Sequence, residues 1–130
     1  MLNTVVVVDD SDVDLLFARI MLERAGVVAR LITFDSAGKA LDFLASTQPE
    51  AAAVDLILLD IHMPGMNGFE FLASHERACA ERGQAAVPVV MLSSSPDPAD
   101  RARAAQHRCV SGYLVKPLDL EAARALAVVR

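Results

Sequence analysis

Three aspartates stand directly after apolar runs in this sequence. Asp9 and Asp10 follow the run Val5–Val8, and Asp60 follows the run Leu56–Leu59. If folding gathers these carboxylates, two like charges roughly 4 Å apart repel by about 4 kcal/mol at an effective dielectric constant of about 20. Such a cluster requires raised pKa values or a bound cation. Oxygen ligands without a His/Cys set favour Mg²⁺, held by one or two carboxylates and several waters.

A hydroxyl and an amine occupy comparable positions later in the chain. Ser93 opens a run of three serines after one apolar run, and Lys116 follows another and precedes Pro117. Four segments with the pattern of a buried strand are therefore each followed by a chemically functional group: two by carboxylates, one by a hydroxyl and one by an amine. A simpler interpretation of Asp9 or Asp10 alone is that it caps the helix that follows.

The elements that must position these residues alternate regularly. Short apolar runs and amphipathic stretches follow one another five times, which is typical of parallel strands joined by crossover helices. The predicted strands are Thr4–Val8, Ala29–Phe34, Leu56–Leu59, Val87–Leu92 and Gly112–Val115. The first predicted helix runs from Asp12 to Ala25, the second begins near Ser36 behind a possible Asp35 cap, and the third follows Asn67-Gly68. The fourth begins at Pro96 and Pro98, and the fifth begins after Pro117 with Asp119 as its N-cap.

This alternation predicts an α/β fold with a doubly wound, five-stranded parallel sheet of flavodoxin type. The strand order is then 2-1-3-4-5, with helices on both faces, and ligands bind outside the carboxyl ends of the strands where the order reverses. The first and third strands are neighbours in this order, about 4.8 Å apart. Asp9, Asp10 and Asp60 therefore meet in one crevice.

Four motifs in order give the chain a resemblance to a known family. They are Val-Val-Asp9-Asp10-Ser, Leu-Leu-Asp60-Ile-His-Met-Pro64-Gly65-Met-Asn-Gly68, Val-Val-Met-Leu-Ser93-Ser and Gly112-Tyr113-Leu-Val-Lys116-Pro117. The chain resembles the receiver domain of two-component response regulators, the CheY-like family, across essentially its full length. Each motif alone is weakly specific, but together and in order they are highly specific.

The resemblance implies a role for each matching residue. It implies that Asp60 accepts a phosphoryl group from a histidine kinase or phosphotransfer protein, while Asp9 and Asp10 help to hold Mg²⁺. It also implies that Lys116 contacts the phosphoryl group and that the Lys116–Pro117 bond is cis. Ser93 then occupies the switch-hydroxyl position, where many members have Thr, and Tyr113 is the switch aromatic.

His62 and two methionines flank the phosphoacceptor position. We expect the backbone carbonyl of His62 to complete the metal shell and its side chain to lie at the rim of the site. Met63 and Met66 are interpreted as packing residues rather than ligands. The domain is then a switch that contributes to its own phosphorylation and dephosphorylation without acting as an enzyme on a metabolite.

Two surfaces are expected to bind partners. A downstream protein is expected on the face formed by the helix after Pro98, the strand Gly112–Val115 and the helix after Pro117. The first helix carries more apolar circumference than one stripe against a sheet requires. We expect part of it to be exposed and to dock a kinase helix pair or phosphotransfer domain, or to form a homodimer, unless neighbouring helices cover it.

Composition limits the remaining function classes. The 130 residues fit one domain, residues 1–130, with 54% hydrophobic and 22% charged residues, which excludes intrinsic disorder. A net charge of -5 argues against direct nucleic-acid binding. Cys79 and Cys109 are interpreted as reduced, buried thiols. No apolar run approaches the ~20 residues of a membrane span, so a cytoplasmic location is expected, and no linker composition suggests an effector domain after Arg130.

Other readings of the acidic cluster are weaker. A phosphohydrolase of haloacid-dehalogenase type requires a second Asp two positions after its nucleophile, where this chain has His62. A phosphate-independent interaction scaffold is possible, yet no chemical group of the switch is missing. Flavin or nucleotide binding is disfavoured because neither GxGxxG nor GxxxxGK[ST] occurs.

Overall fold

The computed structural model describes residues 1–128 and contains one parallel sheet. Its strands are β1 (Leu2–Val8), β2 (Val28–Phe34), β3 (Val54–Leu59), β4 (Val89–Ser93) and β5 (Val110–Val115). All neighbouring pairs are parallel and the order is β2-β1-β3-β4-β5, which confirms the predicted topology. The predicted domain ends at Arg130, which lies outside the described residues.

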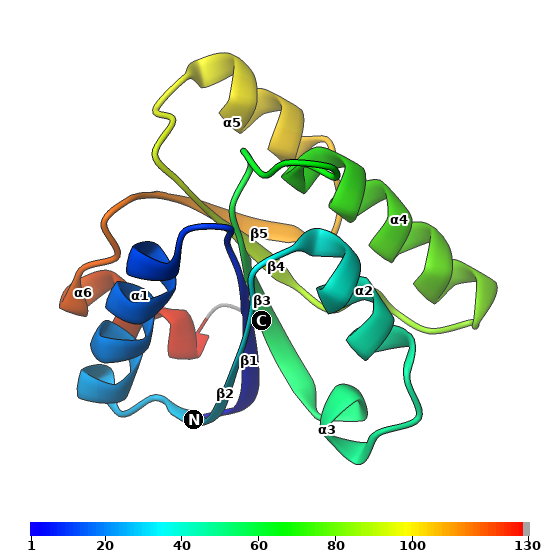
Figure 1. Cartoon of the computed structure of the whole chain (residues 1–130), viewed down its shortest axis with the longest axis horizontal. Helices are drawn as coiled ribbons and strands as arrows, with labels where there is room; N and C mark the ends of the chain where they lie inside the picture. Colours follow the sequence, from blue (N-terminus) through cyan, green and yellow to red (C-terminus); the bar gives the residue numbers. More distant parts are fainter. Residues whose placement is uncertain (129–130) are drawn as a thin grey trace.

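Helices cover both faces of the sheet (Figure 1). On one side lie α1 (Asp12–Ala25) and α6 (Leu120–Ala125), followed by the 3-10 turn Leu126–Val128. The other side carries α2 (Ala37–Ala45), α3 (Pro49–Ala52), α4 (Gly68–Glu81) and α5 (Pro98–Ala105). No helix among residues 1–128 is long and apolar enough to cross a membrane.

The central strands are apolar throughout because both of their faces are covered. In β1, Val6 and Val8 belong to the core under α2 and α4, while Val5 and Val7 belong to the core under α1 and α6. The same alternation holds in β3, and the side chains from Leu56 to Leu59 are fully buried. Two hydrophobic cores therefore hold the strand ends in place.

Local signals set most helix ends. Ser11 caps α1 by accepting from the Asp14 N–H at 3.3 Å, and Gly26 ends the helix in the left-handed conformation at φ 67°. A capping box between Asn67 and Glu70 starts α4. The predicted cap Asp119 of the last helix is confirmed, because its carboxylate accepts from the backbone N–H of Ala122.

One predicted cap was wrong. The second helix is capped by Ser36, whose hydroxyl accepts from the Lys39 N–H at 3.2 Å. Asp35 instead pairs with the Lys39 ammonium at 2.8 Å. Ser36 takes the cap because the helix begins at Ala37, so Asp35 lies one residue too early to accept from the first turn.

The structure also corrects the predicted count and several boundaries. The count of five helices was wrong, since the one-turn helix α3 and the final 3-10 turn were not predicted. Strand β4 begins at Val89 rather than Val87 because Pro88 has no N–H to donate, although its carbonyl accepts from Ile57 at 3.0 Å. Strands β1, β2, β3 and β5 each begin one or two residues before the predicted start.

Candidate functional site

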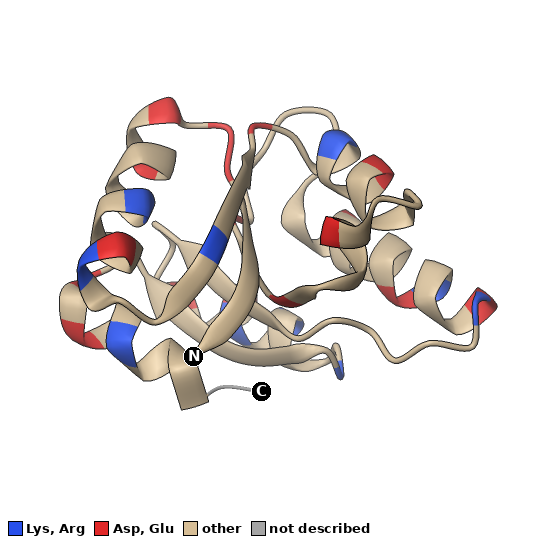
Figure 2. Ribbon diagram, turned by 90° about the horizontal axis from the view of Figure 1, so that it is seen from below, with Lys and Arg blue, Asp and Glu red and all other residues tan. Residues whose placement is uncertain are grey.

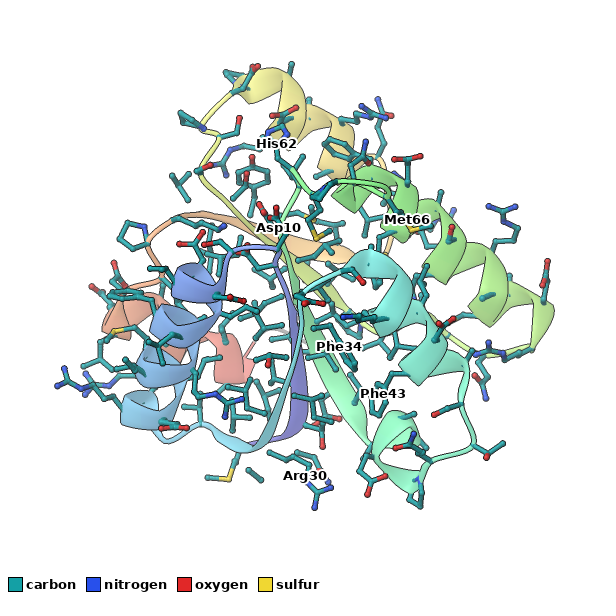
Figure 3. All side chains as sticks on the ribbon, viewed as in Figure 1. Asp10, Arg30, Phe34, Phe43, His62 and Met66 are labelled. Carbon is teal, nitrogen blue, oxygen red and sulfur yellow. The ribbon has the colours of Figure 1, made fainter. Side chains whose placement is uncertain are left out.

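The predicted acidic residues meet where β1 and β3 end. Val8 pairs with Leu59 across these strands, and the Asp60 N–H donates to the Val8 carbonyl at 3.0 Å. One oxygen from each of Asp9, Asp10 and Asp60 lies within 4.8 Å of the others. Asp9 and Asp60 are 3% and 6% exposed, whereas Asp10 is exposed. Figure 2 shows acidic segments gathered at the carboxyl ends of the strands, where α1 starts, and Figure 3 places Asp10 at this end of the sheet.

Neither Asp9 nor Asp10 caps the helix that follows them. Ser11, not Asp9 or Asp10, is the N-cap of α1, so the capping interpretation was wrong. Asp9 Oδ1 accepts from the Ser11 N–H at 2.9 Å, which orients its second oxygen toward the crevice partners described below.

Asp60 is held in an environment that disfavours its charge. Its Oδ1 accepts from the Ile61 N–H at 2.8 Å. Burial raises the pKa of Asp60, and the Asp9 carboxylate raises it further, while Lys116 acts in the opposite direction. A cation or neutralising group that enters the crevice would therefore stabilise the ionised carboxylate.

A glycine at the start of α4 fixes the backbone of Asp60. A Cβ at Gly68 would lie 2.5 Å from the Asp60 carbonyl oxygen and 2.9 Å from Ile61 Cα, so any larger residue would force the backbone to shift. The Gly68 N–H also donates to the Ile61 carbonyl at 2.8 Å. The turn between β3 and α4 is thus packed directly against the backbone of Asp60.

Lys116 brings a positive charge into contact with this cluster. Its Nζ lies 2.5 Å from Asp9 Oδ2, 2.8 Å from Asp14 Oδ2 and 3.6 Å from Asp60 Oδ2. Burial alone would lower the pKa of Lys116, but the hydrogen bonds to Asp14 and Asp9 outweigh it and the pKa is raised. The ammonium therefore stays charged. The Lys116–Pro117 peptide bond is cis.

Asp14 is the residue of this cluster that the sequence reasoning missed. It lies in the first turn of α1, three residues after the cap Ser11. The available signal was its position: the first turn of the helix after Asp9 lies at the same sheet edge as the strand ends.

Ser93 and Tyr113 lie together on the β4 side of the crevice. Ser93 is fully buried, its Oγ accepts from the Ser95 N–H at 3.1 Å, and its carbonyl accepts from the Lys116 N–H at 2.8 Å. The Tyr113 hydroxyl donates to the Ser95 carbonyl at 2.7 Å, and the Arg101 guanidinium lies 4.6 Å from the ring centroid. The loop after β4 is thus tied to the tyrosine. The switch roles of both residues stay predictions.

His62 lies at the outer edge of the site, whereas the two methionines pack in or against the core. The His62 side chain is 65% exposed and its Nε2 is 3.9 Å from Asp100 Oδ2 on α5 (Figure 3). Asp100 Oδ2 also accepts from the Ser95 hydroxyl at 2.8 Å. Met63 is buried in the core and Met66 packs against it, which confirms their packing interpretation. The role of the His62 carbonyl as a ligand stays a prediction.

The donor set fits a hard divalent cation. Asp9, Asp10 and Asp60 offer carboxylate oxygens only, two from buried residues and one from an exposed residue at the mouth. Such a set suits an ion that keeps several waters and takes few protein ligands. Lys116 supplies one compensating charge to this cluster, which leaves negative charge for a cation to neutralise.

Comparisons with known proteins agree with this geometry. The family model described as "Response regulator receiver domain" matches residues 5–127. The two-component response regulator ORR1 of Oryza sativa subsp. japonica is 30% identical over 118 residues, which cover 88% of this chain. A two-component response regulator from Cytophaga hutchinsonii aligns at a TM-score of 0.79 with 27% identity, covering 96% of this chain and 93% of that one.

The chemotaxis response regulator CheY4 of Vibrio cholerae aligns at a TM-score of 0.78 with 25% identity, and the alignment covers 100% of both chains. The chain spans about half the length of the first curated relative, 49% of ORR1. The likeness therefore concerns one domain rather than the whole of that relative. On the matched residues and the shared fold, the chain belongs to the response regulator receiver domain family of two-component phosphorelay signalling.

Proposed function

We propose that the chain is a Mg²⁺-dependent phosphoacceptor switch whose Asp60 receives a phosphoryl group from a histidine kinase or phosphotransfer protein. One observation carries the proposal: the buried Asp60 carboxylate lies beside Asp9 and Asp10 and 3.6 Å from the Lys116 ammonium. Among similar structures are a phosphorylated cyanobacterial phytochrome response regulator, RcpA, and a Mn(2+)-bound form of Rcp1. That one similar protein is phosphorylated and another binds a divalent metal ion supports both parts of the proposal.

The chain's own residues supply most of the transfer chemistry. The Asp60 Oδ2 atom attacks the phosphorus of a donor phosphohistidine, an O–P bond forms, and the N–P bond breaks as the imidazole leaves. The Ile61 N–H holds Oδ1, which leaves Oδ2 as the attacking oxygen. Lys116 donates to a phosphoryl oxygen. A bound Mg²⁺, held by Asp9, Asp10, Asp60 and the His62 carbonyl, would neutralise charge on the transferring phosphoryl group.

Output is proposed to pass through the Ser93–Tyr113 pair. The Ser93 hydroxyl meets a phosphoryl oxygen, the loop after β4 moves with it, and the Tyr113 hydroxyl follows the Ser95 carbonyl to which it donates. The face of α5, β5 and α6 changes in consequence and binds a downstream protein. The open mouth at Asp10 also admits water, so the domain contributes to its own dephosphorylation. The cytoplasmic location stays a prediction.

The exposed face of α1 is proposed as the kinase-docking surface. Ala18 and Leu22 bury one side of this helix against the core. The opposite side exposes large apolar residues at the following fractions: Val13 74%, Leu16 58%, Phe17 40% and Ile20 40%. This confirms that part of the helix is uncovered. An apolar helix face next to the phosphorylation site suits a kinase helix pair, with homodimerisation as the competing use.

Leu16→Glu tests the docking surface. Burying a charge in an apolar contact should slow phosphotransfer from a kinase that phosphorylates the parent by roughly tenfold or more. Phosphorylation by a small donor should be unchanged, because Leu16 is outside the crevice. The control is Ala73→Glu, which places the same charge at an exposed position of α4. Equal kinase rates for Leu16→Glu and the parent would refute docking here, and a monomeric variant of a dimeric parent would assign the face to self-association.

The phosphoacceptor itself is tested with a small phosphoryl donor and Mg²⁺. Intact-protein mass should show one phosphoryl adduct that is labile to hydroxylamine, and peptide mapping should locate it at Asp60. The adduct should be lost completely in Asp60→Asn, and omission of Mg²⁺ should abolish most of it. No adduct in the parent would favour the scaffold reading, and an adduct that persists in Asp60→Asn would require a different acceptor.

A further inference from the structure

The Lys116 ammonium lies on the α1 side of the crevice rather than directly on Asp60. In the sheet order, β3 lies nearer to β5 than β1 does, so Asp60 stands closer than Asp9 to the end of β5, which Lys116 follows. The ammonium nevertheless reaches past Asp60 to Asp9 and to Asp14 on α1, at 2.5 and 2.8 Å. Its distance of 3.6 Å from Asp60 Oδ2 exceeds hydrogen-bond length.

We propose that Asp14 is a positioning residue that draws Lys116 toward α1 and so favours the unphosphorylated state; this rests on the proposed function of Asp60. Asp9 and Asp14 together occupy two of the three donors of the ammonium. To donate to a phosphoryl oxygen on Asp60, the ammonium must shift away from α1. The hydrogen bond between Lys116 and Asp14 then lengthens. Its stabilising free energy is therefore present in the unphosphorylated state and lost in the phosphorylated state.

Asp14 differs from the other partners of Lys116 in burial and in origin. Its side chain is 41% exposed, against 4% for Asp9 and 7% for Asp60. It is carried by a helix rather than by a strand end, and it stands outside the group of oxygens that could hold a cation. Its removal therefore leaves the phosphoacceptor and the predicted metal ligands in place.

A neighbouring residue separates this role from a general charge effect. Asp12 lies in the same first turn of α1 and is exposed, so it makes the same contribution to the helix N-terminus. Asp12→Asn and Asp14→Asn remove the same charge from the same turn. Of the two, Asp14 contacts Lys116, so a difference between the variants reports on the Lys116 contact.

The experiment compares the parent, Asp12→Asn, Asp14→Asn and Asp14→Glu. Each is phosphorylated with acetyl phosphate and Mg²⁺, the donor is removed, and the adduct is followed by intact-protein mass. Because the lost bond is a partly exposed ion pair, Asp14→Asn should retain the adduct roughly three- to fivefold longer than the parent. It should also reach a higher occupancy at limiting donor. Asp12→Asn should match the parent, and Asp14→Glu should return toward it.

The outcomes distinguish this inference from the proposed function. A parent that takes up no phosphoryl group overturns the proposed function and the inference that rests on it. A parent that is phosphorylated with Asp14→Asn equal to it, or with a shorter-lived adduct, overturns the inference alone. A purely structural role for Asp14 would shorten the lifetime or leave it unchanged, so a longer lifetime rescued by Asp14→Glu is specific to positioning.

Discussion

The two ends of the sheet contain polar clusters of opposite character. At the carboxyl ends of the strands, buried Asp9 and Asp60 share one ammonium, and the pKa of Asp60 is raised by burial and by Asp9. Near the amino ends, buried His75 on α4 bonds through Nε2 to the Val87 carbonyl at 3.2 Å and through Nδ1 to the Cys79 thiol at 3.7 Å. One cluster carries excess charge, and the other is neutral.

Each group of the amino-end cluster is stable without charge. Burial lowers the pKa of His75, so the ring stays neutral with one nitrogen donating and the other accepting. Burial, with the nearby Glu76, raises the pKa of Cys109 to about 12, so this thiol stays protonated. Both cysteines are free and buried, as the sequence indicated. Such groups are stable when buried in their uncharged forms.

The size of a cavity does not identify the functional end. A cavity of about 790 Å³ lies at the amino end between α2, α3 and α4, and His75 and Cys79 are among its lining residues. Asp9, Asp10 and Asp60 are not among the residues that line this cavity, yet they carry the unbalanced charge. For a domain that is proposed to bind a cation and a phosphoryl group, uncompensated charge at the strand ends is therefore a better marker of function than cavity volume.

The largest expected effect on stability comes from a substitution at the start of α4, where the helix packs against Asp60. Gly68→Ala places a Cβ against the Asp60 carbonyl, so the backbone must shift, which should lower the free energy of unfolding by about 2–3 kcal/mol. Because the shift displaces Asp60, phosphorylation by a small donor should also slow markedly. Chemical denaturation and adduct formation measure the two effects.

Gly112→Ala is the control for this substitution. Its Cβ would lie 3.8 and 3.9 Å from the methyl groups of Val90, which is ordinary contact. We expect a change in unfolding free energy within about 0.5 kcal/mol. If the two alanine variants are equally stable, the packing of Gly68 against Asp60 does not constrain the site.

His75→Leu should affect stability but not phosphorylation. It leaves the Val87 carbonyl without the ring N–H, which should cost roughly 1–2 kcal/mol of unfolding free energy. The rate of phosphorylation by a small donor should stay at the parent value, because the ring lies at the other end of the sheet. Loss of phosphoryl uptake in a folded His75→Leu variant would contradict the division between the two clusters.

The matched control is His107→Leu. His107 Nδ1 lies 2.5 Å from Glu76 Oε1, and both side chains remain partly exposed, at 22% and 28%. A partly exposed pair contributes less, so we expect a loss below about 1 kcal/mol. A larger loss for His107→Leu than for His75→Leu would place the stabilising contact at the surface pair instead.

The strand ends were predictable because burial and register act through regular periods. Apolar runs covered on both faces predicted the central strands, and the strand order then placed Asp9 beside Asp60. The one-turn helix α3 was not predicted, since four residues carry too little periodicity. Asp35 was preferred over Ser36 as a cap because both types favour that position and only the backbone decides.

The contact of Asp14 with Lys116 could not be derived from the sequence. The two residues are 102 positions apart, and the contact depends on how the loop after β5 folds over the strand ends. Helical periodicity places Asp14 on a face of α1 but does not give the direction of a flexible lysine side chain. Long-range pairs between flexible charged side chains therefore cannot be predicted from the sequence pattern.

The pH dependence of stability should differ in sign between the two clusters. The pKa of Asp60 is raised above 3.8 by folding, so the folded state binds more protons between the two values and stability falls as pH rises through that interval. The pKa of His75 is lowered from 6.5, so the unfolded state binds more protons and stability is lost as pH falls below about 6.5.

Asp60→Asn isolates the first of these effects and is the smallest change expected. Without added metal at neutral pH, removing the buried charge should raise Tm by about 4 °C, the shift that roughly 1 kcal/mol produces in a domain of this size. The gain should shrink as pH falls and should be lost below 3.8, where Asp60 becomes protonated in both the folded and the unfolded state. Asp42→Asn, on an exposed position of α2, should leave Tm unchanged. A lower Tm for Asp60→Asn at neutral pH would mean that Lys116 already compensates the Asp60 charge, and the excess charge that distinguishes this end of the sheet would not exist.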